Sequence, residues 1–305
     1  TGAALPEGAD TVVLQEDVQI EGGQLEVVGP LKAGANARAA GEDMQQGAEI
    51  FQEGHQLRPE ELGVMAAAGL GEVSVFKPLK VAVISTGAEL RAPGQAARVD
   101  QIFDANRPML CALLRRWGME VVDIGIVPDE AAAVRAALDR AAARADVILT
   151  SGGASAGDED HMSAVLRAGG GMALWRIAVK PGRPLALGVW GGVPVFGLPG
   201  NPVAAFVCTL IFARPALLRL AGAGFQVPKA LHLPAAFSKS KKAGRREYLR
   251  ARLRDGAVEV FASEGSGRVS GLSWAEGLVE LPDVAAEILP GQTVCFLPYA
   301  SFGLP

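Results

Sequence analysis

Residues 146–160 read DVILTSGGASAGDED, in which an apolar run at 147–149 passes into a loop of glycine and serine residues that ends in acids. An apolar run followed by a glycine-rich turn is typical of a buried parallel strand at its carboxyl end. In open α/β sheets, ligands bind at that edge. The stretch therefore predicts a strand whose loop contacts a ligand; the alternative is an ordinary solvated loop with its acids turned outward.

The loop of this stretch offers three kinds of ligand contact. Its glycines let backbone N–H groups approach a ligand, and its serines add hydroxyl groups. Its acids suit a divalent cation, because Mg²⁺ prefers hard oxygen ligands. The residues concerned are Ser151, Gly152, Gly153, Ser155, Asp158 and Asp160.

Two later segments follow the same plan. Residues 175–184 (WRIAVKPGRP) and 193–202 (VPVFGLPGNP) each predict an apolar strand that ends in a glycine- and proline-containing turn. Arg176 and Lys180 are four residues apart, so in one strand they would share a face, about 13 Å from each other. Three successive strands of this kind predict one shared ligand-binding edge.

A helix start follows the third of these strands. Asn201 is a favoured N-cap residue and Pro202 a favoured first helical residue, and the apolar residues 203–220 continue the helix. The free N–H groups at a helix N-terminus attract anions. The turn after the third strand is therefore a candidate anion site.

The composition is that of a globular protein without a large charged surface. Of 305 residues, 50% are hydrophobic and 20% are charged, and the net charge is −4. The basic block at 239–246 is short and lacks interleaved aromatic residues, so we expect no nucleic acid partner. The longest apolar run, 203–213, is too short to span a bilayer, so we expect no membrane partner. An anionic ligand must then be held by local positive groups.

The cysteines indicate a reducing compartment. Cys111, Cys208 and Cys295 lie far apart and predict no disulfide framework. Cys111 and Cys208 fall in apolar helical stretches, which favours buried free thiols and a cytoplasmic location. The histidines are isolated, so a zinc cluster is not expected.

The order of predicted elements divides the chain into four regions. Residues 1–47 carry short β-like runs, for example at 11–14, and 48–76 form a helical linker region. Strands and helices alternate over 77–224, which predicts a parallel sheet with helices on both faces. Residues 225–305 carry short β runs between glycine and proline residues, which favours a small β-barrel or sandwich.

Several elements can be bounded more closely from periodicity and capping signals. We expect helices at 59–69, 104–117, 131–144 and 161–168, strands at 81–86 and 120–127, and a single helical turn at 284–288.

Two carboxylates outside the glycine-rich loop are expected at the same edge, because Glu89 and Asp129 each follow a predicted strand. Asp129 could instead cap the alanine-rich helix, and Glu89 could be a solvated first-turn acid. With Lys180, Arg176 and a helix N-terminus, the edge suits a phosphate-bearing ligand with a metal ion. Neither a Gly-x-Gly-x-x-Gly nor a Walker-type motif is present, which argues against dinucleotide and P-loop sites.

Eight motifs then occur in a characteristic order. They are TGAALPEGAD at 1–10, GEDM at 41–44, STGAEL at 85–90, QIFDANR at 101–107, GIVPDE at 125–130, SGGASAGDED at 151–160, AVKPGRP at 178–184 and GLPGNPV at 197–203. Together they resemble the molybdopterin molybdenumtransferase family (MoeA and the gephyrin E domain). The chain has Ala88 where the family usually has Asp and Arg183 where it usually has Lys. The resemblance begins after the family's Ser-x-Met-Asp-Gly-Tyr-Ala-type segment.

The resemblance implies a fold and an activity. The fold is an α/β multidomain one, with a β-rich N-terminal piece, a helical linker region, a MoaB/Mog-like three-layer α/β/α domain and a C-terminal small β-barrel domain. The activity is the Mg²⁺-dependent insertion of molybdate into adenylylated molybdopterin (molybdopterin-AMP), with release of AMP. Molybdopterin adenylyltransferase is the expected transient partner, and the full-length protein is expected to be a homodimer.

The resemblance also implies residue roles. The expected catalytic residues are Asp43, Glu89, Asp129 and Lys180. The expected substrate-binding residues are Thr1, Thr150, Ser151, Gly152, Gly153, Ser155, Asp158, Asp160, Arg176, Pro181, Gly182, Pro199, Gly200, Asn201, Pro202, Arg246 and Ser266. The expected metal ligands are Glu89, Asp129 and Asp158. Asp43, taken alone, has the simpler interpretation of a surface turn residue.

Two other functions are compatible with parts of the pattern. One is a non-catalytic molybdopterin-binding or scaffold protein, which the gephyrin resemblance allows. The other is a CinA-like nucleotide pyrophosphatase, against which GLPGNP at 197–202 and the C-terminal β region count.

Overall fold

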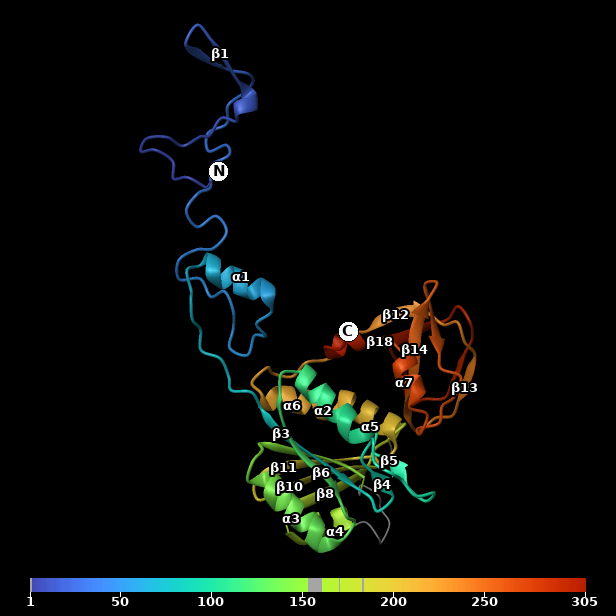
Figure 1. The fold of residues 1–305 in the computed structure, drawn as a ribbon. Helices are drawn as coiled ribbons and strands as arrows, with labels where there is room; N and C mark the ends of the chain where they lie inside the picture. Colours follow the sequence, from blue (N-terminus) through green and yellow to red (C-terminus); the bar gives the residue numbers. More distant parts are fainter. Residues whose placement is uncertain (1, 153–160, 170, 183) are drawn as a thin grey trace. The chain divides into compact units, whose positions relative to one another are not determined.

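The structure is a computed structural model that describes residues 2–152, 161–169, 171–182 and 184–305. It divides into two compact units, Thr1–Ser74 and Val75–Pro305 (Figure 1). Each unit is described by itself.

The first unit contains one hairpin and one helix within its described residues. Its elements are η1 (Gln15–Asp17), β1 (Val18–Glu21), β2 (Gln24–Val27) and α1 (Pro59–Ala67). Gly22 and Gly23 both have positive φ, which suits the tight turn of this hairpin. The strand expected at 11–14 was wrong, because in this described segment Val12 N–H donates instead to Ala35 O and joins two loops.

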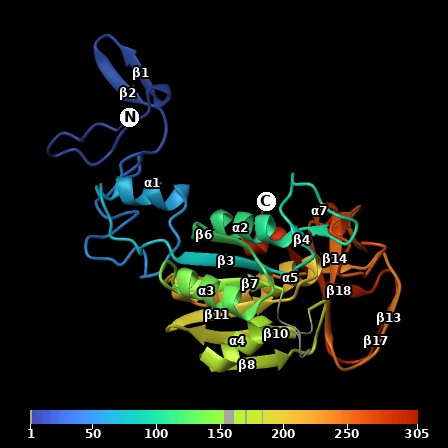
Figure 2. The same ribbon diagram turned by 60° about the horizontal axis from the view of Figure 1, so that its bottom comes forward.

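The second unit is built around a sheet with the strand order β6-β3-β7-β11-β10-β8 (Figure 2). The strands are β3 (Lys80–Thr86), β6 (Glu120–Val127), β7 (Val147–Ser151), β8 (Gly171–Arg176), β10 (Pro184–Trp190) and β11 (Val193–Leu198). Neighbours among β6, β3, β7 and β11 are parallel, whereas β10 is antiparallel to both β11 and β8. The carboxyl ends of β7, β8 and β11 therefore meet at one edge, as expected.

The expectation of a parallel sheet was wrong for β10, which runs antiparallel to both of its neighbours. Gly191 and Gly192, with φ of 56° and 84°, join β10 to β11 in a two-residue hairpin. Two consecutive positive φ values match the twist of antiparallel strands, and glycine adopts them at little cost.

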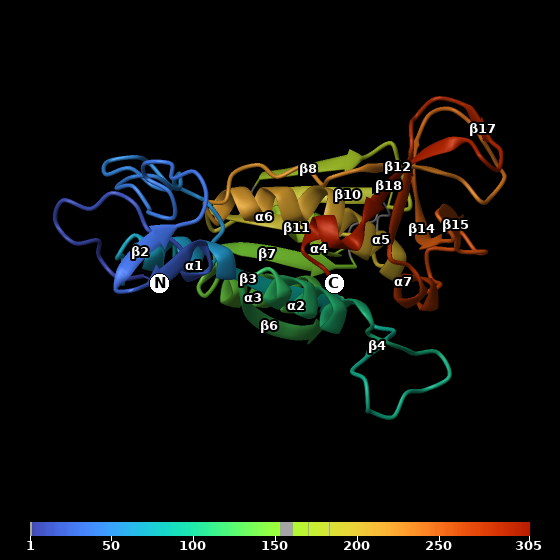
Figure 3. The ribbon, with the colours of Figure 1, turned by 90° about the horizontal axis from the view of Figure 1, so that it is seen from above.

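Helices cover both faces of this sheet (Figure 3). Successive residues of a strand point to opposite faces of the sheet, so each strand contributes side chains to both helix layers. They are α2 (Asn106–Arg116), α3 (Ala131–Ala142), α4 (His161–Gly169), α5 (Pro202–Cys208), η2 (Thr209–Ala213) and α6 (Arg214–Leu220). Val81 and Val83 of β3 pack in one apolar cluster with α2, α5 and α6, and Ala82 and Ile84 pack in the other with α3 and α4.

The helix that follows β11 changes geometry along its length. The middle segment η2 is a π-helix, and Pro215 follows it. Proline has no N–H to donate to the carbonyl four residues earlier, which accounts for the interruption. The whole run Pro202–Leu220 is long and apolar enough to cross a membrane by length and composition, but 67% of its most apolar window is buried inside the protein. It is the central helix of the core.

The C-terminal part folds into a second sheet, β12-β18-β16-β14-β15. Its elements are β12 (Leu231–Pro234), β14 (Arg246–Arg254), β15 (Ala257–Val260), β16 (Gly277–Leu281) and β18 (Thr293–Pro298), with the ribbon β13 (Lys239–Lys241)–β17 (Ala286–Ile288) and the helices α7 (Ser270–Trp274) and η3 (Tyr299–Phe302). A bridge between Ala235 and Val258 brings the two edges together, as expected of a small barrel. The helical turn expected at 284–288 was wrong, because Ala286–Ile288 pairs with β13 as a strand.

A short strand joins the two sheets. The strand expected at 175–184 divides: β8 ends at Arg176, and β9 (Val179–Lys180) pairs in parallel with β14. Val179 is buried in the cluster that contains Tyr248 and Leu278 of the C-terminal domain. Arg176 and Lys180 therefore lie in different strands, and the expected shared face was wrong.

Candidate functional site

A hollow of about 900 Å³ lies at the carboxyl ends of β3, β7 and β11, beside the C-terminal domain. We call it the carboxyl-edge cleft. The short strands β4 (Leu90–Arg91) and β5 (Ile102–Phe103) also border it. The polar and charged residues that line it are Thr86, Glu89, Asp104, Asn106, Asp129, Ser151, Lys180, Asn201, Arg245, Glu264 and Ser266.

One buried asparagine ties the loops of the cleft together. Asn106 Nδ2 donates to Ser151 Oγ at 2.7 Å and to Gly200 O at 2.6 Å. Asp104 Oδ1 accepts from the backbone N–H groups of Asn106 and Arg107, each at 3.1 Å, and so starts helix α2 at this point. Asn106 was predicted only as part of the QIFDANR motif, and Asp104, two residues before it, marked the start of the helix.

Glycines allow the loops to approach closely. Gly152 has φ +88°, and a Cβ there would come within 2.4 Å of Thr86 O. Gly200 lies against Gly152, since a Cβ at Gly200 would be 3.8 Å from Gly152 Cα. Gly87 leaves room for Glu89, whose Oε2 would be 2.7 Å from a Cβ at position 87. The backbones at the ends of β3, β7 and β11 thus meet at one place.

The two acids expected at this edge both line the cleft. Asp129 Oδ1 is buried and has no hydrogen-bond partner among the described residues. The alternative role of Asp129 as a helix cap was wrong, because Glu130 is the N-cap of α3. Glu89 is exposed, as its alternative of a solvated acid expected, but it lies in a turn before β4 and not in the first turn of a described helix.

These acids fit a magnesium ion only as a partial ligand set. A group of three or more His, Cys, Asp or Glu residues that could hold a metal ion is absent from the described parts of the chain. Mg²⁺, however, commonly takes one or two protein carboxylates and completes its shell with water and substrate phosphate. A buried carboxylate oxygen without a partner is costly unless something binds it, so Asp129 with Glu89 suits such an ion.

Lys180, the lysine that lines the cleft, is already paired with carboxylates. Lys180 Nζ lies 2.6 Å from Glu264 Oε2 and 3.6 Å from Glu247 Oε2. Lys239 Nζ contacts the same two carboxylates, Glu264 directly and Glu247 at 3.3 Å. Burial alone would lower the pKa of Lys239, but the two carboxylates hold it above its usual value. Burial alone would likewise raise the pKa of Glu264, but Lys180 and Lys239 hold it below its usual value.

The helix N-terminus at the cleft is also partly occupied. Asn201 and Pro202 take the N-cap and first helical positions of α5, as expected. Within the described residues, however, the Asn201 side chain makes no capping hydrogen bond, and Val203 N–H donates to Ser266 O at 3.0 Å. Fewer N–H groups at the N-terminus of α5 are therefore free to bind an anion than expected.

The 263–268 loop brings the C-terminal domain to the cleft. Buried Arg250 donates to Ser263 O, to Arg268 O at 2.6 Å and to Gly265 O at 3.3 Å. Its guanidinium also stacks over Phe261. Arg250 thus fixes the backbone of the loop that presents Glu264 and Ser266.

Arg246 and Thr150 do not line the cleft as expected. Arg246 Nη1 binds Glu280 Oε1 at 2.7 Å, whereas the neighbouring Arg245 lines the cleft. Arg245 lies in the bend before β14, and Arg246 is the first residue of that strand. Thr150 is fully buried in β7.

The structure brings most of the described expected residues together. Those that line the cleft are Glu89, Asp129, Ser151, Gly152, Lys180, Pro181, Gly182, Pro199, Gly200, Asn201, Pro202 and Ser266. Asp43 is exposed in a turn of the unit Thr1–Ser74. Outside the described residues lie Thr1, Gly153, Ser155, Asp158, Asp160 and Arg183, as does the side chain of Arg176.

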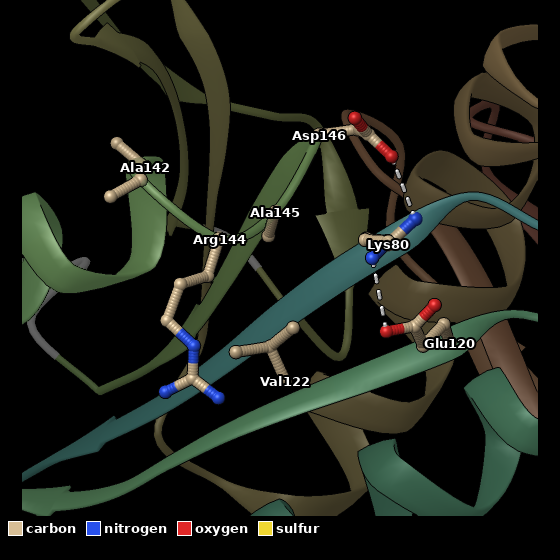
Figure 4. A pocket seen from close by; sticks show the side chains of 8 residues that line it. Lys80, Glu120, Val122, Ala142, Arg144, Ala145 and Asp146 are labelled. Atoms are coloured by element: carbon tan, nitrogen blue, oxygen red, sulfur yellow. Dashed lines mark hydrogen bonds and ion pairs between the residues drawn. The ribbon is translucent and has the colours of Figure 1, made fainter.

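A second hollow, of about 540 Å³, lies at the opposite edge of the sheet (Figure 4). Three of its charged residues pair with one another: Lys80 Nζ is 3.3 Å from Glu120, and Asp146 Oδ2 accepts from Lys80 N–H at 2.8 Å. The buried side-chain atoms without a partner in the described residues belong to other positions. The carboxyl-edge cleft is therefore the stronger candidate site.

Comparison with protein families finds three matching regions. Residues 1–69 match the MoeA N-terminal region (domain I and II), 82–219 match a probable molybdopterin binding domain, and 232–299 match the MoeA C-terminal region (domain IV).

Individual relatives agree with the family matches. The chain is 35% identical over 306 aligned residues to the molybdopterin molybdenumtransferase of Haemophilus influenzae, covering 98% of this chain and 76% of the relative. It is 36% identical to molybdopterin molybdenumtransferase 2 of Mycobacterium tuberculosis, covering 95% and 74%.

Two crystal structures of the MoeA protein from Pyrococcus horikoshii superpose with TM-scores of 0.81 and 0.83, at 31% and 26% identity. Each alignment covers 98% of this chain and 74% of the other. The likeness extends through the α/β domain and the regions on either side of it, which confirms the expected fold class. The chain belongs to the molybdopterin molybdenumtransferase family of molybdenum cofactor biosynthesis.

Proposed function

We propose that this chain inserts molybdate into adenylylated molybdopterin at the carboxyl-edge cleft, in a Mg²⁺-dependent reaction that releases AMP. The observation that carries the proposal concerns Asp129, which lines the cleft of about 900 Å³ together with Glu89 and has a buried Oδ1 without a hydrogen-bond partner among the described residues. A volume of this size suits a pterin linked to a nucleotide.

In this proposal Glu89 and Asp129 hold Mg²⁺, and Asp158 is a third ligand. The bound ion supplies neutralising charge beside the phosphates. Glu89 also orients a water molecule toward the phosphoanhydride, and cleavage of that bond releases AMP. Both roles require these carboxylates in their ionised form.

The remaining expected residues take binding roles in the proposal. Backbone N–H groups around Gly152 and Gly200 contact phosphate oxygens, and Asn106 keeps those loops together. Lys180 and Ser266 face the tetrahedral molybdate, which needs local positive charge and hydrogen-bond donors. The other proposed substrate-binding residues, with Asp43 as a catalytic residue, are those named from the family resemblance, apart from Thr150 and Arg246, which do not line the cleft.

Domain boundaries, assembly and location complete the proposal. We place domains at 1–47, 48–76, 77–224 and 225–305; the division between the compact units after Ser74 supports the second boundary. We expect a homodimer of the full-length protein and a transient complex with molybdopterin adenylyltransferase. Free thiols at Cys111, Cys208 and Cys295 support a cytoplasmic location.

The test is release of AMP from adenylylated molybdopterin with Mg²⁺, with and without molybdate. We expect molybdate-dependent release that falls about 100-fold or more in Asp129→Asn and in Glu89→Gln, the scale typical of a lost catalytic carboxylate. Glu130→Gln is the matched control, because Glu130 is exposed and outside the cleft lining. Wild-type rates in both cleft variants would refute the assigned roles.

The alternative is a binding or scaffold protein without turnover. The paired state of Lys180 favours it, because Lys180 contacts Glu264 at 2.6 Å and can hold molybdate only after that contact is broken. Tight binding of adenylylated molybdopterin without molybdate-dependent AMP release would select this alternative.

A further inference from the structure

Lys180, which lines the carboxyl-edge cleft, and Lys239, whose side chain is 12% exposed and lies outside the cleft lining, converge on one carboxylate. Lys180 comes from β9 and Lys239 from β13, and both ammonium groups contact Glu264 of the 263–268 loop. The two ammonium groups contact different oxygens, Oε2 and Oε1 respectively. A carboxylate held between two ammonium groups occupies the kind of position that an external oxyanion would take.

The two carboxylates of this cluster differ in burial. The Glu247 side chain is 10% exposed and lies beneath the lysines, whereas the Glu264 side chain is 44% exposed and lines the cleft. Glu247 is therefore a fixed counter-charge, while Glu264 can exchange lysine contacts for water. With both acids present, two positive and two negative charges cancel.

The backbone below Glu264 is fixed independently of that carboxylate. Arg250 holds three carbonyl groups of the 263–268 loop, and Ser266 O accepts from Val203 N–H. Rotation of the Glu264 side chain would leave these bonds unchanged. Ser266, which also lines the cleft, would stay in place beside the vacated ammonium groups.

We propose that Glu264 occupies the oxyanion position of the cleft and that molybdate binds by displacing it from Lys180 and Lys239. This inference rests on the proposed function, because it takes molybdate as the oxyanion. Glu264 then sets the affinity of the cleft for an oxyanion. Its carboxylate neutralises one of the two ammonium charges, and a divalent tetrahedral anion binds only by displacing that carboxylate.

The test is calorimetric titration of the full chain with sodium molybdate, without pterin substrate, at constant ionic strength. A partly exposed ion pair changes an equilibrium constant by up to about fivefold. Glu264 forms two such pairs, so Glu264→Gln should bind molybdate about 5- to 25-fold more tightly than wild type. The control is Glu259→Gln, which removes a carboxylate paired with Arg252 at 3.0 Å outside the cleft lining and should bind as wild type does.

A second variant separates charge from loop disturbance. In the double variant Glu264→Gln with Lys239→Gln, one ammonium group is gone, so the gain in affinity should disappear. Unchanged or weaker molybdate binding by Glu264→Gln alone would overturn the proposal, and so would a gain that persists in the double variant. AMP release is measured separately, so a failed transferase assay with a positive titration would reject the proposed function and leave the displacement of Glu264 standing.

Discussion

Replacement of Asn106 by alanine tests whether one buried amide holds the loops of the cleft together. The side chain is 6% exposed and donates to Ser151 Oγ and Gly200 O at 2.7 and 2.6 Å. Each bond contributes about 1 kcal/mol, and the truncation leaves a hydroxyl and a carbonyl without a donor. The expected loss is about 3 kcal/mol in the free energy of unfolding of the α/β domain.

The assay is differential scanning calorimetry. For a domain of this size, 1 kcal/mol corresponds to about 2–4 °C in Tm, so Asn106→Ala should lower Tm by about 6–12 °C. Asn106→Asp keeps the shape but places a carboxylate oxygen against the carbonyl of Gly200, so it should lower Tm at least as much. If the aspartate variant were as stable as wild type, the hydrogen bonds would not be the cause.

Asn201→Ala supplies the matched control. An average N-cap substitution costs about 1 kcal/mol, but the Asn201 side chain makes no capping bond in the described structure. We therefore expect a fall of less than about 2 °C. A loss at Asn201 equal to that at Asn106 would refute the reasoning, because position in the helix and not the observed hydrogen bonds would then decide the stability.

Other substitutions and reagents give further predictions. Gly152→Ala puts a Cβ 2.4 Å from Thr86 O at a position of positive φ, so it should lower the free energy of unfolding by about 3 kcal/mol. Gly192→Ala is the control, because Gly192 also has positive φ but has open space around it, and it should cost only about 1 kcal/mol when the two variants are compared by Tm. Arg250→Gln removes donors from three loop carbonyls and should both lower Tm and reduce molybdate affinity, whereas a stable variant with normal affinity would contradict its positioning role. Burial raises the pKa of Cys208 to about 12, so alkylation at pH 8 should reach this thiol only after denaturation, as peptide mass mapping would show.

The regular elements of the α/β domain were predictable because their signals are local. Strand β6 has the bounds expected from its apolar run, and β3 differs from its expected range by one residue. Helix α2 ends before Gly118, whose positive φ is the usual stop signal. Strand β10 was not predicted, although Gly191 and Gly192 are a signal for a hairpin, because the sequence pattern predicts one strand over 175–184 and none directly after it.

The contacts across the cleft could not be predicted from local patterns. Lys180 and Glu264 are 84 residues apart, and Asn106 and Gly200 are 94 residues apart. Neither pair has a spacing rule, since the first contact depends on the pairing of β9 with β14 and the second on how the start of α2 meets the turn after β11. The motifs therefore identified the edge of the sheet correctly, but not the partners that already occupy its lysine.

The two walls of the cleft therefore differ in whether a ligand must first displace an existing contact. The acidic wall belongs to the α/β domain and includes a buried oxygen of Asp129 that has no partner among the described residues. The basic wall depends on the C-terminal domain, where Lys180 and Lys239 are both bound to Glu264. A ligand that brings a cation or hydrogen-bond donors can bind the first wall without breaking a contact, whereas an oxyanion that binds Lys180 must replace a carboxylate there. Differences in oxyanion affinity among variants should therefore arise on the C-terminal side of the cleft.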